Sequence, residues 1–101
     1  GQSSTTHGYT AGGSTAGGGA SDNNTIEKFS FATDGNATDI GDLTRAIRNT
    51  AGQSSTTHGY ASGGNAPNTT VIDKFSFTTD GNATDIGDLT VARYGPAGQQ
   101  Y

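Results

Sequence analysis

The sequence predicts an all-β protein built from two tandem repeats. Residues 1–9 (GQSSTTHGY) return unchanged as residues 52–60, and residues 33–44 (TDGNATDIGDLT) return as residues 79–90. Aromatic and β-branched residues alternate with polar ones at the same place in both copies, which is typical of β-strands. Helices are disfavoured because the chain contains 17 glycines, each of which would cost about 1 kcal/mol inside a helix.

The composition restricts both the core and the partners. Leu, Ile, Val and Phe account for 13 of the 101 residues, fewer than a globular core usually contains. The net charge of −4 is nevertheless too small to keep the chain disordered by repulsion. The absence of cysteine excludes disulfides and thiolate metal sites. Five basic and nine acidic residues argue against nucleic acid as a partner, and no apolar run is long enough for a membrane span.

Each repeat is expected to form four short strands. In the second copy they cover residues 53–56, 60–63, 71–77 and 84–90. A corner at His58-Gly59 is expected between the first two strands. Asp80-Gly81 predicts a hairpin turn between the last two, since a type I′ turn needs positive φ at both of its central residues.

The third strand of the repeat carries apolar residues on both faces. Phe75 and Phe77 share one face because side chains alternate along a strand, and Ile72 faces the other way. Apolar groups on both faces are expected of a sheet that lies between two neighbouring sheets. The residues expected to pack between sheets are Phe29, Phe31, Phe75, Phe77, Ile40, Ile86, Leu43 and Leu89.

The two copies differ in length at one place. The offset between matching residues is 51 before the Gly-Gly doublet and 46 after it, so the segment that contains residues 14–24 is five residues longer than its counterpart, which contains residues 65–68. Surface loops tolerate such length changes and buried strands do not, so this segment is predicted to be a loop. The chain divides into a first repeat at residues 1–50, a second at 51–96, and the redundant start of a third at 97–101.

Several short motifs recur around the Gly-Gly doublet. Tyr60 stands just before Gly63-Gly64, Phe75 lies on the third strand, and residues 89–93 read LTVAR. These motifs resemble a blade of the kelch-type β-propeller family, in which a Leu-x-x-x-Arg segment leads into the innermost strand. The family's fourth-strand tryptophan has no counterpart, since the chain contains no Trp. The repeats are also similar to kelch-like repeats of marine bacteriophage structural proteins.

The resemblance implies two four-stranded blades, which cannot cover their own outer faces. Propellers have about four to eight blades, and repeat proteins need about three or more units. Gly98-Gln99 matches Gly52-Gln53, so the chain stops where its own beginning would follow. We therefore expect a homo-oligomer that closes a propeller head to tail, with a trimer of about six blades favoured over a tetramer of about eight. A filament, or a fragment of a longer repeat protein, is the alternative.

The acidic loop segments resemble the start of a calcium-binding loop. Residues 34–39 (DGNATD) and 80–85 place oxygen ligands at alternating positions but lack the glycine and the distal Glu of such loops. A turn with Asx hydrogen bonds is favoured over a metal site. His7 and His58, each followed by glycine, are assigned to turns as well. The weak metal candidates are Asp34, Asn36, Asp39, Asp80, Asn82 and Asp85.

No set of nucleophile, base and orienting group is visible, so we expect neither catalytic activity nor a cofactor. We expect a structural, self-assembling protein derived from a virion or a fibre, with an extracellular or virion-associated location. The alternative is a carbohydrate-binding, lectin-like module that uses the loops after Gly-Gly and after Leu89. Its expected contact residues are Asn65, Asn68 and Tyr94.

Overall fold

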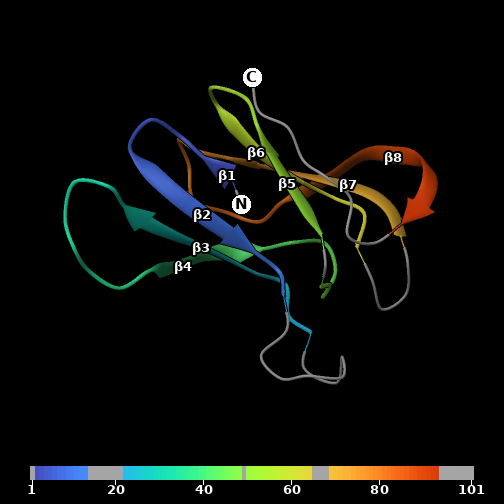
Figure 1. Ribbon diagram of the computed structural model, residues 1–101, viewed down its shortest axis with the longest axis horizontal. Helices are drawn as coiled ribbons and strands as arrows, with labels where there is room; N and C mark the ends of the chain where they lie inside the picture. Colours follow the sequence, from blue (N-terminus) through green and yellow to red (C-terminus); the bar gives the residue numbers. More distant parts are fainter. Residues whose placement is uncertain (1, 14–21, 49, 65–68, 94–101) are drawn as a thin grey trace.

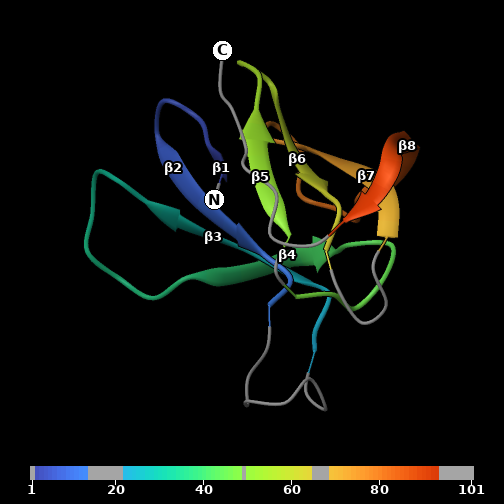
Figure 2. The ribbon, with the colours of Figure 1, turned by 45° about the vertical axis from the view of Figure 1, so that its right-hand side comes forward.

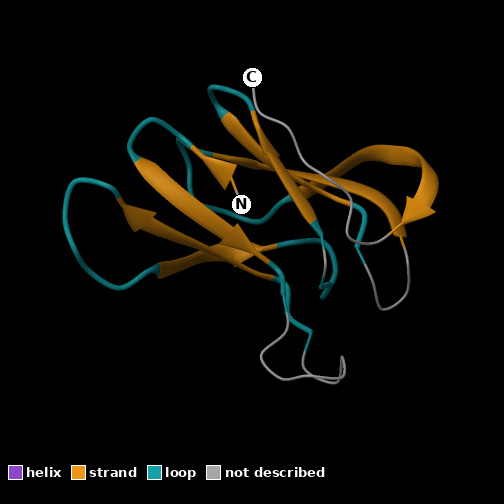
Figure 3. Ribbon diagram, viewed as in Figure 1, coloured by secondary structure: helices purple, strands orange, loops and turns teal. Residues whose placement is uncertain are grey.

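The computed structural model describes residues 2–13, 22–48, 50–64 and 69–93. These residues form eight strands in two four-stranded antiparallel sheets, and no helix (Figures 1 and 3). In each sheet the strands are hydrogen-bonded in chain order. The expected all-β fold with four strands in each repeat is confirmed. Within the described part of the chain, nothing resembles an apolar helix able to cross a membrane.

The two sheets share their strand order and register but differ in the lengths of their strands. The strands of the first sheet are β1 (Gln2–Ser3), β2 (His7–Ala11), β3 (Thr25–Ser30) and β4 (Thr38–Asp42). Those of the second sheet are β5 (Ala51–Ser54), β6 (His58–Ser62), β7 (Thr69–Ser76) and β8 (Thr84–Arg93). His7 lies opposite Ser30 in the first sheet, and His58 lies opposite Ser76 in the second. Identical sequence therefore gives the same register, but β4 ends at Asp42 whereas β8 continues to Arg93, which pairs with Thr69.

The corner expected at His58-Gly59 lies elsewhere, because both residues belong to β6. The turn comes just before it: the backbone N–H of Ser55 donates to the carbonyl oxygen of His58 at 2.9 Å. The Ser55 hydroxyl also accepts the backbone N–H groups of Thr57, at 3.3 Å, and His58, at 3.1 Å. A serine side chain that binds the backbone in this way makes a turn without a glycine.

The hairpin expected around Asp80-Gly81 is present, since β7 and β8 pair antiparallel, but its type I′ turn is wrong. The connection between β7 and β8 runs from residue 77 to 83, and Gly81 is not among the glycines with positive φ. Its shape depends on the other sheet, since the backbone N–H of Asp42 donates to Oδ1 of Asn82 at 3.0 Å. A contact far away in sequence therefore overrides the local turn preference.

The hydrophobic core lies between the two sheets. Tyr9, Ile26 and Ile40 come from the first sheet, and Ala61 and Phe75 from the second. The first strands of the two sheets, β1 and β5, contact each other near the middle of the molecule, while β8 lies at the right of the view (Figure 1). The remaining core residues are Leu43 and Ile47, which follow β4, and Ala83, which precedes β8.

The segment between β4 and β5 ties the two sheets together (green in Figure 2). Ile47 in this segment is buried, and its carbonyl oxygen accepts the backbone N–H of Gly13 at 2.7 Å. The doublets leave room for it: Gly12 and Gly64 have positive φ, and a Cβ on Gly64 would lie 2.5 Å from Cδ1 of Ile47. The Gly-Gly doublets thus provide both the backbone conformation and the space that this crossing needs.

Candidate functional site

Each sheet carries apolar side chains on both of its faces, because side chains alternate along a strand. In the first sheet Tyr9 and Ile26 lie on one face, which we call the tyrosine face. Phe29 and Phe31 lie on the opposite face, which we call the phenylalanine face. The corresponding residues of the second sheet are Tyr60 and Ile72 on its tyrosine face, and Phe75 and Phe77 on its phenylalanine face.

The two sheets meet through unlike faces. The tyrosine face of the first sheet packs on the phenylalanine face of the second, where the ring of Tyr9 stacks on Phe77 at a centroid distance of 4.6 Å. The same tyrosine ring lies 5.8 Å from Phe75, which is only 2% exposed. Ile26 is fully buried at this contact. We call the contact between the two sheets the internal joint.

A buried carboxylate, that of Asp73, stabilises the internal joint. Its oxygen Oδ2 accepts the backbone N–H of Thr44 at 3.0 Å, and the Thr44 hydroxyl lies 2.8 and 2.9 Å from its two carboxylate oxygens. Asp73 is only 3% exposed, so these hydrogen bonds offset the cost of removing the carboxylate from water. It lies two residues before Phe75 and therefore on the same face.

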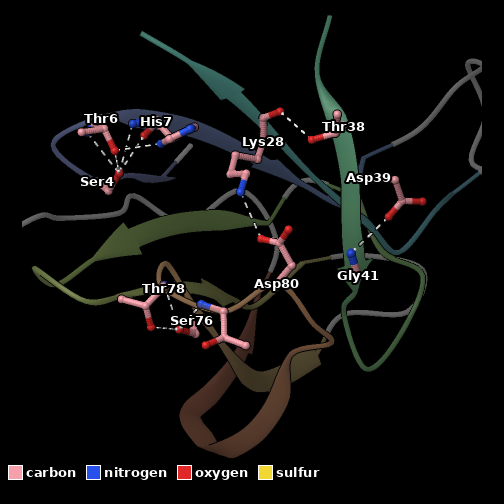
Figure 4. Close-up of polar contacts among 11 residues, drawn as sticks. Ser4, Thr6, His7, Lys28, Thr38, Asp39, Gly41, Ser76, Thr78 and Asp80 are labelled. Atoms are coloured by element: carbon pink, nitrogen blue, oxygen red, sulfur yellow. Dashed lines mark hydrogen bonds and ion pairs between the residues drawn. The ribbon is translucent and has the colours of Figure 1, made fainter. Parts of the chain in front are cut away.

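The loop before β8 adds further polar contacts to the internal joint. Nζ of Lys28, on β3, lies 3.1 Å from Oδ1 of Asp80 (Figure 4). The backbone N–H of Ala83 donates to the carbonyl oxygen of Asp42 at 2.8 Å, beside the bond from Asp42 to Asn82. Directional contacts of this kind fix the position of one sheet along the other, which apolar packing alone does not do.

A glycine at position 41 allows the sheets to approach closely. Gly41 on β4 lies against the backbone of Gly81, and a Cβ on Gly41 would overlap the carbonyl oxygen of Gly81. Its repeat counterpart, Gly87, has nothing within 4 Å of a Cβ position. The same glycine is therefore enclosed by the other sheet in the internal joint and open in the second sheet.

The two faces that take no part in the internal joint leave apolar side chains in contact with water. On the phenylalanine face of the first sheet, Phe29 is 39% exposed and Phe31 is 56% exposed. Ile86 in the second sheet is 48% exposed, whereas its counterpart Ile40 is 8% exposed. We call these two surfaces the free faces: the free phenylalanine face and the free tyrosine face.

The residues expected to pack between sheets divide into two groups. Those in or against the core are Phe75, Phe77, Ile40 and Leu43. Those on or beside the free faces are Phe29, Phe31 and Ile86, which are exposed, and Leu89, which is half-buried. The sequence pattern gave no packing role to Tyr9, Thr44 or Asp73. The two-residue period was the available signal for Asp73, because it places this residue beside Phe75.

In the acidic segments proposed as weak metal candidates, two carboxylates bind the backbone within strands β4 and β8. Oδ1 of Asp39 accepts the backbone N–H of Gly41 at 3.1 Å (Figure 4), and Oδ1 of Asp85 accepts that of Gly87 at the same distance. In the described ranges, no group of three or more His, Cys, Asp or Glu side chains is placed to hold a metal ion. The candidates on the first loop, Asp34 and Asn36, are exposed.

The two histidines have matching surroundings. Nδ1 of His7 lies 2.8 Å from Oγ1 of Thr6, beside the turn that the Ser4 side chain makes (Figure 4). Nδ1 of His58 lies 2.8 Å from Oγ1 of Thr57. In both copies the threonine hydroxyl therefore holds the ring beside the turn.

The contacts expected of a carbohydrate site fall on Asn65, Asn68 and Tyr94, which lie outside the described residues. A cavity beside β1 and β2 has about 150 Å³. Sites for small molecules usually have about 300–1,000 Å³. This cavity is lined by Gln2, Thr10, Ala11, Thr50 and Gly52.

The sequence matches no protein-family model and no curated protein. The free faces carry the exposed large apolar side chains Phe29, Phe31 and Ile86. Each free face has the residue types of one side of the internal joint.

Proposed function

We propose that the protein is a non-catalytic structural unit that joins copies of itself into a closed, kelch-like β-propeller. One observation carries this proposal: each free face has a counterpart that is buried in the internal joint. Phe29 repeats Phe75, and Ile86 repeats Ile40. Because a sheet face is buried against a neighbouring sheet in one repeat, the matching face of the other repeat is suited to burial against a further sheet.

The two free faces are different from each other, and this determines how copies can join. A free phenylalanine face can receive the free tyrosine face of a second copy, as in the internal joint. Such a contact is heterologous, so each added copy leaves one face of each kind open at the ends. Only a closed ring covers every face. With two sheets per chain, a ring of about six blades needs a trimer, which is our favoured assembly.

The apolar side chains on the free faces supply a driving force for association. Removal of a large apolar side chain from water contributes about 1.5–3 kcal/mol. Phe29, Phe31, Ile86 and Val91 are all exposed large hydrophobic residues of the described chain. Their burial in a second joint would offset part of the entropy that copies lose when they associate.

Measurement of the native mass over a dilution series tests the proposal. We expect a trimer at high concentration, and a tetramer would equally support a closed propeller. Phe31→Ser removes an exposed ring from the free phenylalanine face and should shift the distribution to the monomer. Thr5→Ala, at an exposed position in the turn after β1, is the matched control and should assemble normally. A chain that remains monomeric at every concentration would overturn the proposal.

A further inference from the structure

We infer that the joint between copies keeps the register of the internal joint, and that residue 27 contributes to its strength. The inference rests on the proposed function, and its partner is a second copy of this chain. Every polar contact of the internal joint joins a residue of the first repeat to one of the second. Each of these contacts can be shifted by one repeat: the first-repeat residue is replaced by its counterpart in the second repeat, and the second-repeat residue by its counterpart in the first repeat of another copy. The shift assigns partners to residues that have none in the internal joint.

The glycine contact is the clearest case. Within one chain a Cβ on Gly41 would overlap the backbone of Gly81, whereas a Cβ on Gly87 would meet open space. Translation by one repeat places Gly87 of one copy against Gly35 of the next. Alanine is accommodated at Gly87 in a single chain but not at a joint of that kind.

The ion pair has a counterpart as well. Lys28 and Asp80 pair across the internal joint, and the matching residues are Lys74 and Asp34. Neither of the latter forms an ion pair among the described residues, and Asp34 is exposed. Translation by one repeat brings Lys74 of one copy to Asp34 of the next.

Residue 27 is one of two places where the repeats differ in charged contacts; the other is Arg45, which donates to Thr69 across the internal joint and is matched by Val91. Asp73 accepts the backbone N–H and the hydroxyl of Thr44 in the internal joint. The residue that matches Asp73 is Glu27, and the residue that matches Thr44 is Thr90, which lies within β8. Glutamate keeps the charge but adds a methylene, which loses more rotamer freedom when it is fixed. The joint between copies is therefore weaker than the internal joint, so the two-sheet chain forms before the assembly does.

A second difference between the repeats also weakens the joint between copies. Ala61 is buried in the core, whereas its counterpart Thr10 carries a hydroxyl on an exposed position. Burial of a hydroxyl without a partner costs free energy. Both differences between the repeats thus lower the affinity of the joint between copies.

Charge exchange tests the assigned register. Lys74→Glu and Asp34→Lys should each raise the dissociation concentration of the assembly roughly three- to tenfold, because like charges then face each other. The double variant restores an opposite pair and should return to within roughly twofold of the original chain. Failure of this rescue in an assembling protein would overturn the register. An original chain that never assembles would instead overturn the proposed function.

The glycine and residue-27 variants provide independent readouts. Gly87→Ala should leave the circular dichroism of the monomer unchanged and raise the dissociation concentration at least roughly tenfold, as overpacking of a close contact does. Glu27→Asp should lower that concentration roughly threefold, and Glu27→Gln should raise it. Normal assembly of Gly87→Ala would overturn the glycine contact. An equal effect of Asp and Gln at residue 27 would overturn its role.

Discussion

Phe75 and Phe29 occupy the same position in the two repeats, and each covers a glycine of the neighbouring strand. In both sheets a Cβ on that glycine, Gly59 or Gly8, would overlap the phenylalanine ring. The two rings nevertheless differ in exposure, 2% for Phe75 and 39% for Phe29, because only the second sheet has a neighbour on this face. The comparison separates the contribution of the local sequence to burial from that of the neighbouring sheet, which cannot be separated in a chain without repeats.

The local structure comes from the repeat itself, and the burial comes from the neighbouring sheet. Strand register, the serine turns and the ring above glycine are the same in both copies. The exposed fraction differs between the copies. Paired substitutions at matching positions therefore measure what a neighbouring sheet contributes, with the local contribution held constant.

The largest expected difference is between Phe75→Ala and Phe29→Ala. Phe75→Ala leaves a cavity in the core and should lower the free energy of unfolding by about 3–5 kcal/mol. Phe29→Ala removes a partly exposed ring and should cost about 1–2 kcal/mol. Urea unfolding of dilute protein, below the concentration of association, measures both. Equal costs would show that the internal joint adds nothing to the burial of Phe75.

The second comparison is between Gly41→Ala and Gly87→Ala in the dilute chain. Gly41 has φ of 155° and no space for a Cβ beside Gly81. Its substitution should cost about 2–4 kcal/mol through overlap and backbone strain. Gly87→Ala meets open space and should change stability by less than about 0.5 kcal/mol. Thermal unfolding followed by circular dichroism measures the pair, and equal shifts would contradict the closed contact at Gly41.

The strands could be predicted from the sequence because they depend on contacts close along the chain. The alternation around Phe75 and the repetition of the whole unit were sufficient for them. The loop before β8 could not be predicted, because Asn82 binds the backbone of the other sheet. The same reason explains the missed Asp73, whose partner Thr44 lies 29 residues away in sequence.

The exposure of the two free faces also could not be predicted from the local sequence pattern. The alternation of apolar and polar residues predicts that both faces of each sheet are apolar. It therefore predicts the same surroundings for Phe29 and Phe75. Their difference depends on how many sheets the assembly contains. The number of sheets in the assembly depends on how one sheet packs on the next, and not on the sequence of a single strand.

The third comparison concerns the carboxylates at matching positions. Asp73→Ala leaves the backbone N–H and the hydroxyl of Thr44 without an acceptor at the internal joint, which should cost about 1–3 kcal/mol. Glu27→Ala changes an exposed residue and should cost less than about 0.5 kcal/mol in the dilute chain. Urea unfolding distinguishes them. A large loss at Glu27 would mean that this side chain already has a stabilising partner within one chain.

The smallest expected effect is that of Lys28→Gln. The ion pair to Asp80 is partly open to solvent, with side-chain exposures of 25% and 58%, so its loss should cost about 0.2–1 kcal/mol. The loss should shrink as salt is added, because ions screen exposed charges. Lys74→Gln, which breaks no ion pair among the described residues, should be neutral in the dilute chain. If Lys74→Gln destabilised the monomer as much as Lys28→Gln does, the two lysines would have equivalent surroundings. The asymmetry between the internal joint and the free tyrosine face would then be lost at this position.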